Sequence, residues 1–232
     1  MDGQLTPPSQ FFHQDSSDLV GLLCLARALE GGESDIVSLH HVFNILQRDH
    51  PDVVRTLTQP IWFFDRKGEV SRGQEPYIRN PVLYLERDDN SGAPEGASRV
   101  YSKWDPYYVR SLTRFSDPPL SLIPPLSEAQ KYAMEVLERT CAEESLHMVL
   151  EVGDLQFVSN LHVLHARTAY KDHKPPMPRR HLMRLWLSVP EGEEGEGETK
   201  GGWRLAFGDS REERRGGIQV DDVAAVANLD AE

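Results

Sequence analysis

The stretch from Glu151 to Pro190 constrains the fold more than any other part of the chain. Apolar residues alternate with polar ones on both sides of Gly153-Asp154, which is typical of two paired strands joined by a tight turn. A histidine-bearing segment and a Pro-rich loop follow, and the stretch ends in a strand that carries arginines. The pattern therefore predicts a β-rich architecture.

The last of these strands, residues 179–189, has an unusual distribution of charge. A period of two divides its side chains between two faces, with Arg180, Leu182, Arg184 and Trp186 on one and His181, Met183, Leu185 and Leu187 on the other. Because a guanidinium group does not lose its proton, a buried arginine needs a carboxylate or phosphate partner. Either this is an edge strand whose arginines point into water, or an anion binds there. Trp186 is expected in the core.

Composition argues against several classes of partner. The chain has 37 acidic and 25 basic residues, a formal net charge of −12, which disfavours nucleic acid and anionic membranes as main partners. No apolar run reaches the roughly 18 residues of a membrane helix, and no signal sequence is evident. Cys24 and Cys141 lack C-x-x-C spacing, as expected of reduced thiols. We therefore expect a cytoplasmic protein.

The composition also predicts how the chain is divided. Its 232 residues suffice for one domain with a sizeable core. Residues 1–10 are polar and contain prolines, which predicts a disordered N-terminal remnant, and residues 11–190 form the expected domain. The acidic, Gly/Glu-rich residues 191–202 are typical of a solvated linker. Residues 203–232 are predicted to be a partly ordered C-terminal extension.

Several elements can be placed from local signals. Leu19 to Glu30 is ambiguous, because propensity favours a helix ended by two glycines whereas a buried strand fits equally well. Ser127 has capping-box spacing and begins the clearest helix, which runs to about Cys141. Two shorter helices are predicted at 38–46 and 51–57, and short strands at 35–37, 61–64, 81–85 and 100–101. Residues 104–114 are predicted to form a packed but irregular segment.

One pair of residues points to metal chemistry when it is combined with a distant histidine. His13 and Asp15 lie two apart, so in an extended segment their side chains point the same way. This motif alone is weak and is usually a surface feature. With His165 as a third ligand it would form a two-histidine, one-carboxylate triad, which leaves three positions open on Fe(II). His162 competes with His165 for that place.

Three segments together resemble the TauD/TfdA family of Fe(II)- and 2-oxoglutarate-dependent oxygenases, especially its fungal members. They are FHQDSSDLVGLLCLARALEGGESDIVS, GDLQFVSNLHVLHARTAY and RRHLMRLWLS, in that order. The resemblance implies a mainly β fold with flanking helices, namely a double-stranded β-helix (jelly roll) that is cupin-like and clavaminate-synthase-like. It also implies that Leu19 to Glu30 is a strand.

The resemblance assigns roles to individual residues. His13, Asp15 and His165 match the family's iron ligands, and Asn160 is a candidate for orienting them. Further residues match positions that bind the co-substrate or substrate: Ser34, in place of a threonine that bonds the far carboxylate of 2-oxoglutarate; Arg180, which pairs with that carboxylate; and Arg184, which in relatives touches an acidic substrate.

The implied function is a dioxygenase that uses Fe(II), 2-oxoglutarate and O2. It would hydroxylate or otherwise oxidise a small, acidic organic molecule and release succinate and CO2. Family members carry a substantial segment before the HxD motif, whereas only twelve residues precede His13. An alternative is therefore a catalytically silent, truncated jelly-roll remnant that binds a ligand or a partner. A missing barrel edge would also expose strands, which predicts a homo-oligomer.

Overall fold

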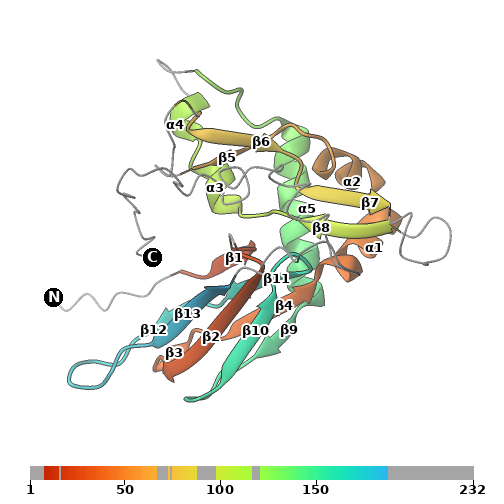
Figure 1. Cartoon of the computed structure of the whole chain (residues 1–232). Helices are drawn as coiled ribbons and strands as arrows, with labels where there is room; N and C mark the ends of the chain where they lie inside the picture. Colours follow the sequence, from red (N-terminus) through yellow and green to blue (C-terminus); the bar gives the residue numbers. More distant parts are fainter. Residues whose placement is uncertain are drawn as a thin grey trace, which may run out of the picture.

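The computed structural model describes residues 8–15, 17–66, 73, 75–87, 98–116 and 121–187. Within these residues the chain forms thirteen strands and five helices, so the mainly β composition is confirmed. Figure 1 shows the strands of the two larger sheets in its lower half, with the helices and two hairpins above them. The predicted linker at 191–202, the extension at 203–232 and residues 1–7 lie outside the described residues.

Two antiparallel sheets carry the elements of the predicted site. One has the strand order β1 (Gln10–His13), β11 (Val163–Arg167), β4 (Ser34–Ser38) and β9 (Leu146–Met148). The other has the order β10 (Leu155–Ser159), β2 (Leu19–Ala26) and β13 (His181–Leu187). A short ladder joins β3 (Glu30–Gly31) to β12 (Tyr170–Lys171).

The strands on either side of Gly153-Asp154 exist, but the prediction that they pair with each other is wrong. β9 ends at Met148 and pairs with β4, whereas β10 pairs with β2 in the other sheet. The intervening turn places Gly153 at a φ of 97°, a conformation that favours glycine. The turn therefore carries the chain from one sheet to the other.

Leu19 to Ala26 is a strand, as the resemblance implies, and the helix predicted from propensity is wrong. β2 lies between β10 and β13 and forms ladders with both. Its residues Val20 and Cys24 are buried against the interior. Pairing on both edges outweighs the intrinsic helix preference of a Leu- and Ala-rich segment.

The helices predicted from capping signals are confirmed. Ser38 caps α1 (Leu39–Asp49), α2 is Pro51–Leu57, and Ser127 forms the capping box of α5 (Glu128–Glu144). The segment expected to be irregular contains two short helices, α3 (Pro106–Arg110) and α4 (Thr113–Ser116). Asp105 accepts a hydrogen bond from the Tyr107 N–H, so it caps α3.

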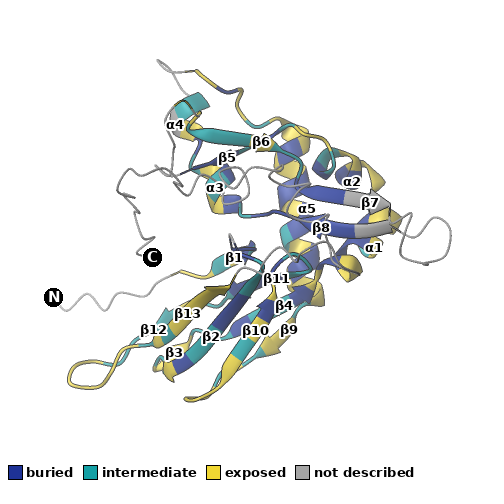
Figure 2. Cartoon of the chain, viewed as in Figure 1, coloured by how far each residue is buried: buried dark blue, intermediate teal, exposed yellow. Residues whose placement is uncertain are grey.

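Two hairpins complete the described fold. They are β5 (Trp62–Asp65) with β6 (Tyr77–Asn80), and β7 (Leu83–Arg87) with β8 (Ser98–Ser102). The largest cluster of buried side chains joins α1, α2 and α5 to these hairpins, and buried residues lie along all of these elements in Figure 2. Trp62 and Trp104 meet in this cluster edge to face. The predicted strands at 61–64, 81–85 and 100–101 are confirmed, and β6 was not predicted.

The outer face of the β10–β2–β13 sheet is apolar. Residues directly opposite one another on neighbouring strands share a face. Phe157 and Leu185 both lie opposite Gly21, and Leu155 and Met183 both lie opposite Leu23. The exposed members of this face are Leu155 (50%), Phe157 (58%), Met183 (42%), Leu185 (39%) and Leu187 (39%).

The inner face of this sheet includes the arginine-bearing side of β13. Val20 and Val158 are buried there, and Trp186 lies opposite Val20. Trp186 is nevertheless 45% exposed, so its expected place in the core is wrong. The register of β13 shifts between His181 and Leu182.

Candidate metal centre

The three residues predicted to bind a metal come together at the end of β1. β1 and β11 pair antiparallel, which places His13 opposite His165 with their ring centroids 4.4 Å apart. Asp15 follows β1 by two residues, and its Oδ2 lies 3.7 Å from Nε2 of His165. One ligand atom from each of the three residues lies within 4.8 Å of the other two. The arrangement is that of a two-histidine, one-carboxylate site.

The hydrogen bonds of these residues leave ligand atoms available. His13 Nδ1 donates to the Phe11 carbonyl at 2.8 Å, so Nε2 is the ring nitrogen left for a metal. Among the described residues, Asp15 Oδ2 is a buried polar atom without a hydrogen-bond partner, as is His165 Nδ1. A buried, unpartnered carboxylate oxygen beside two imidazoles suits Fe(II).

Electrostatics favour the protonation states that a metal requires. Burial alone would raise the pKa of Asp15, but His165, Arg184 and His13 outweigh it and hold that pKa well below its usual range. Burial lowers the pKa of His165, and the nearby carboxylate of Asp15 opposes this only in part. An ionised carboxylate beside a neutral imidazole is the form that binds a metal without first releasing a proton.

Asn160 fixes the backbone that carries Asp15. Asn160 is 1% exposed, and its Oδ1 accepts a hydrogen bond from the Asp15 N–H at 3.0 Å. Its Nδ2 donates to the carbonyls of Asp15 and Ser17, the second at 2.6 Å. In return, Gln14 Nε2 donates to the Asn160 carbonyl at 2.5 Å. Asn160 thus holds both sides of Asp15.

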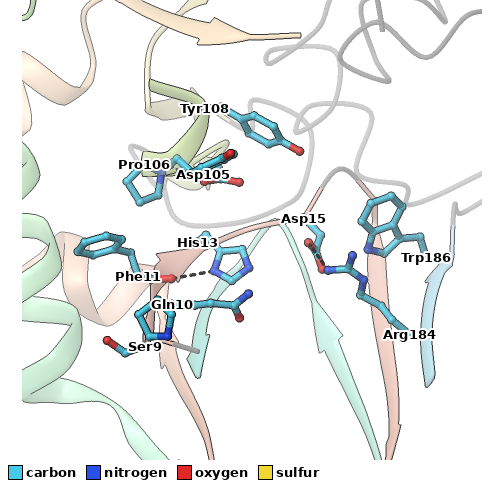
Figure 3. Close-up of a pocket in the computed structure, with 12 residues that line it drawn as sticks. Ser9, Gln10, Phe11, His13, Asp15, Asp105, Pro106, Tyr108, Arg184 and Trp186 are labelled. Carbon is cyan, nitrogen blue, oxygen red and sulfur yellow. Dashed lines mark hydrogen bonds and ion pairs between the residues drawn. The ribbon is translucent and has the colours of Figure 1, made fainter. Parts of the chain in front are cut away.

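A cavity of about 240 Å³ opens beside the metal-binding residues. Figure 3 shows His13 and Asp15 at its edge, with Asp105, Pro106 and Tyr108 facing them across the space. Its lining comes from three places: Pro8, Ser9, Gln10, Phe11, His13 and Asp15 at β1; Asp105, Pro106, Tyr107 and Tyr108 at α3; and Arg184 and Trp186 on β13. The contribution of α3 was not predicted, although Asp105-Pro106 is a sequence signal for the start of a helix.

Arg184 is the predicted arginine that lies next to the metal-binding residues. Its Nη1 is 3.4 Å from Oδ1 of Asp15, and its guanidinium lies 4.6 Å from the centroid of the Trp186 ring (Figure 3). Arg184 therefore presents positive charge to the cavity from a stacked position.

Arg180 and Ser34 lie elsewhere. Arg180 Nε and Nη2 donate to the Gly32 carbonyl at 3.3 and 3.0 Å, and its guanidinium lies 5.2 Å from the Tyr170 ring centroid. It lines a separate cavity of about 20 Å³, together with Cys24 and Gly32. Ser34 Oγ donates to Gln156 Oε1 at 3.1 Å. Neither residue lines the larger cavity beside His13.

No helix in the described part of the chain combines the length and the apolar character needed to cross a membrane.

Comparison with known proteins gives consistent results. FR-33289 synthase from Streptomyces rubellomurinus is 30% identical over 194 residues, which are 82% of this chain and 52% of that protein. Taurine hydroxylase-like protein SAT17 from Stachybotrys chartarum is 30% identical over 174 residues, which are 75% of this chain and 41% of that protein. The chain thus spans about half the length of the curated relatives it matches.

Solved structures share the fold at lower identity. An asparagine oxygenase in complex with Fe(II), 2S,3S-3-hydroxyasparagine and succinate is 19% identical, with a TM-score of 0.52 over 80% of this chain and 51% of that one. The non-heme iron oxygenase OrfP in complex with Fe is 18% identical, with a TM-score of 0.53 over 81% of this chain and 52% of that one.

The sequence model of the family described as "Taurine catabolism dioxygenase TauD, TfdA family" matches residues 2–186. The match includes the HxD motif, the distal histidine, Arg180 and Arg184. The chain therefore belongs to the TauD/TfdA family.

Proposed function

We propose that this chain is an Fe(II)- and 2-oxoglutarate-dependent dioxygenase whose iron ligands are His13, Asp15 and His165. The observation that carries the proposal is the set of three ligand atoms within 4.8 Å of one another, beside a cavity, in a member of the TauD/TfdA family. We also propose that residues 11–190 form a double-stranded β-helix that is cupin-like and clavaminate-synthase-like. The two larger antiparallel sheets and the fold shared with the two oxygenases support this.

The residues of the site have distinct roles in this proposal. When bound, Fe(II) supplies the chemistry by which 2-oxoglutarate and O2 are consumed, succinate and CO2 are released, and a substrate C–H bond is oxidised. The hydrogen bond from His13 Nδ1 to the Phe11 carbonyl directs Nε2 to the metal. Asp15 contributes negative charge, because its lowered pKa keeps it ionised at neutral pH. Asn160 holds the Asp15 backbone in place.

We assign co-substrate binding to Arg180 and Ser34, as the family resemblance implies. The guanidinium of Arg180 now donates to a neutral acceptor, the Gly32 carbonyl. A carboxylate would accept a charge-assisted, two-pronged hydrogen bond from the same guanidinium, and such bonds are about twice as strong as neutral ones. The far carboxylate of 2-oxoglutarate would therefore replace the carbonyl as the acceptor of Arg180.

We assign substrate binding to the cavity beside His13. Arg184 gives it positive charge, and its aromatic side chains include Phe11, Tyr107, Tyr108 and Trp186. Metal binding would engage the carboxylate of Asp15 and weaken its attraction for Arg184, which then presents its charge to a substrate anion. A small acidic molecule with an apolar body fits this lining.

Anaerobic titration of Fe(II) and 2-oxoglutarate into the protein tests the proposal, with detection of the weak visible charge-transfer band of the chelate. We expect the band in the wild type, its loss in Asp15→Ala and a higher 2-oxoglutarate requirement in Arg180→Ala. His41→Ala is the control, because His41 is exposed and pairs with Glu144 instead. A folded wild-type protein that gives neither the band nor succinate would instead be a silent binding protein.

A further inference from the structure

We propose that Glu138 is a positioning residue of the metal centre, because it anchors the strand that carries His13. The inference rests on the proposed function, since it concerns how the iron ligands are held. Glu138 belongs to α5, which lies outside the two larger sheets and contributes no ligand to the candidate centre. Both of its carboxylate oxygens lie near the Phe12 N–H, at 3.3 Å for Oε1 and 3.2 Å for Oε2.

The strand that Glu138 contacts has few other backbone restraints. β1 has four residues and lies at the end of its sheet, with β11 as its partner. Its register with β11 is irregular: Gln10 lies opposite Arg167 and His13 opposite His165, with a shift in between. A short strand with an interrupted ladder is weakly held by pairing alone. The Phe12 N–H, within this interruption, is bonded to a side chain from α5 instead.

The contacts around His13 place an anchor on each side of it. Phe12, the residue before it, is bonded to Glu138 and has its ring buried in the main core. Gln14, the residue after it, donates its backbone N–H to the Trp104 carbonyl at 2.7 Å. The Trp104 contact is between backbone groups, whereas the Glu138 contact depends on a side chain and can be removed by substitution.

The surroundings of Glu138 set it apart from other glutamates of α5. It is partly buried, whereas Glu135 and Glu143 on the same helix are exposed. Burial raises the pKa of Glu138 to about 7, although the Phe12 N–H, Arg110 and His13 oppose the rise. Placing an acidic group where burial disfavours its charge is costly, and such positions are enriched at functional sites. The hydrogen bond to β1 is the compensation that the structure shows.

A positioning role predicts an effect on metal affinity that packing alone would not. Loss of an outer partner of a metal site commonly weakens metal binding by about 10- to 100-fold. Because Glu138 acts through the backbone, we expect the lower end of that range, about tenfold, in Glu138→Ala. Glu138→Gln keeps an acceptor oxygen for the Phe12 N–H, so it should retain most of the affinity.

The experiment compares Glu138→Ala and Glu138→Gln with Glu135→Ala, which removes an exposed glutamate from the same helix. One measurement is amide hydrogen exchange of residues 11–14 in metal-free protein, where Glu138→Ala should exchange faster and the other two as slowly as the wild type. The second is the Fe(II) dissociation constant, which should rise about tenfold in Glu138→Ala alone.

The outcomes separate this inference from the proposed function. If Glu138→Ala matches the wild type in exchange and in Fe(II) affinity, the inference is overturned. The inference is also overturned if Glu138→Gln is as impaired as Glu138→Ala in amide exchange and in Fe(II) affinity. Because Glu138→Gln keeps an acceptor for the Phe12 N–H, it tests the inference even if Glu138→Ala folds poorly. A wild-type protein that binds no Fe(II) overturns the proposed function, whereas the exchange measurement still reports whether Glu138 anchors β1.

Discussion

At the scale of single residues, the candidate centre depends on the buried hydrogen bonds that Asn160 makes around Asp15. Asn160 bonds the N–H and the carbonyl of Asp15 and the carbonyl of Ser17, and all of these contacts are buried. Removing one partner of a buried hydrogen bond leaves the other unsatisfied, which costs about 1–3 kcal/mol. Removing the Asn160 side chain should therefore affect both the stability of the fold and the placement of Asp15.

We expect Asn160→Ala to lower the free energy of unfolding by about 2 kcal/mol, because it leaves three backbone groups without partners. Fe(II) affinity should fall in the same variant, since Asp15 would no longer be held from both sides. Urea denaturation and Fe(II) titration measure the two effects. Asn44→Ala, on the exposed side of α1, is the matched control and should leave both unchanged. Unchanged Fe(II) affinity in folded Asn160→Ala would contradict the prediction.

Gly32 controls the position of Arg180. Its φ is +75°, and a Cβ at this residue would lie 2.6 Å from Nε and 2.8 Å from Cδ of Arg180. Gly32→Ala should therefore displace the guanidinium and raise the 2-oxoglutarate concentration needed to form the charge-transfer band. Backbone strain of about 1–3 kcal/mol also lowers stability.

Gly153→Ala separates these two effects. Gly153 has a φ of +97°, and among the described residues nothing lies within 4 Å of the Cβ position. This control should show a comparable loss of stability with an unchanged 2-oxoglutarate requirement. Equal 2-oxoglutarate requirements in both variants would mean that Arg180 does not bind the co-substrate.

At the scale of elements, local signals and tertiary contacts determine different parts of the fold. Caps such as Ser38 and Ser127 act within one turn, so α1 and α5 could be predicted from the sequence. Leu19–Ala26 could not be predicted from propensity, because its strand conformation depends on two partners that are distant in the chain. The separation of β9 from β10 likewise follows from their partners, β4 and β2, and not from the turn between them.

The same distinction applies to the candidate site. The motif identified His13, Asp15 and His165, because ligand types and order are written in the sequence. It did not show that Arg184 and Arg180 line different cavities, since that depends on the register shift at the start of β13 and on Gly32. Nor did it show the cavity wall formed by α3, a helix of five residues.

The contact between α5 and β1 predicts a dependence of stability on pH. Burial raises the pKa of Glu138 to about 7 from an ordinary value of 4.5, and Arg110, His13 and the Phe12 N–H oppose this. Cys141, one turn further along α5, also interacts with this carboxyl. Between these two values the folded protein binds more protons than the unfolded chain, so the free energy of unfolding should fall as the pH rises.

Glu138→Gln has no ionisable group at this position, so it should lack this part of the decrease. Urea denaturation of metal-free protein at about pH 5 and about pH 8 measures the difference. We expect the stability of Glu138→Gln relative to the wild type to increase over this interval. A constant difference between the two proteins would show that the pKa of Glu138 is not raised by folding.

At the scale of the whole molecule, the apolar outer face of β10, β2 and β13 is the feature that most affects behaviour in solution. Its exposed side chains are contributed by neighbouring strands and form one continuous surface. Phe157 crosses the space above Gly21, where its Cε1 lies 3.1 Å from the position of a Cβ, and so extends toward Leu185. Large exposed apolar patches mark interaction surfaces or aggregation sites, and β13 adds a sheet end within the described residues.

We therefore expect the protein to self-associate in a concentration-dependent manner, as the sequence also suggested. Replacing both Phe157 and Leu185 with threonine keeps strand propensity while it removes apolar surface, so self-association and binding of a hydrophobic dye should both decrease. The control replaces Leu122 and Tyr132 with threonine, because these residues are 54% and 45% exposed and lie outside the sheet. Sedimentation velocity over a range of concentrations provides the measurement. Two results together would contradict the prediction: a wild type that stays monomeric, and a Phe157/Leu185 variant that binds as much dye as the control. Removing the two central side chains of this face would then have changed neither self-association nor dye binding, so the face would not mediate self-association.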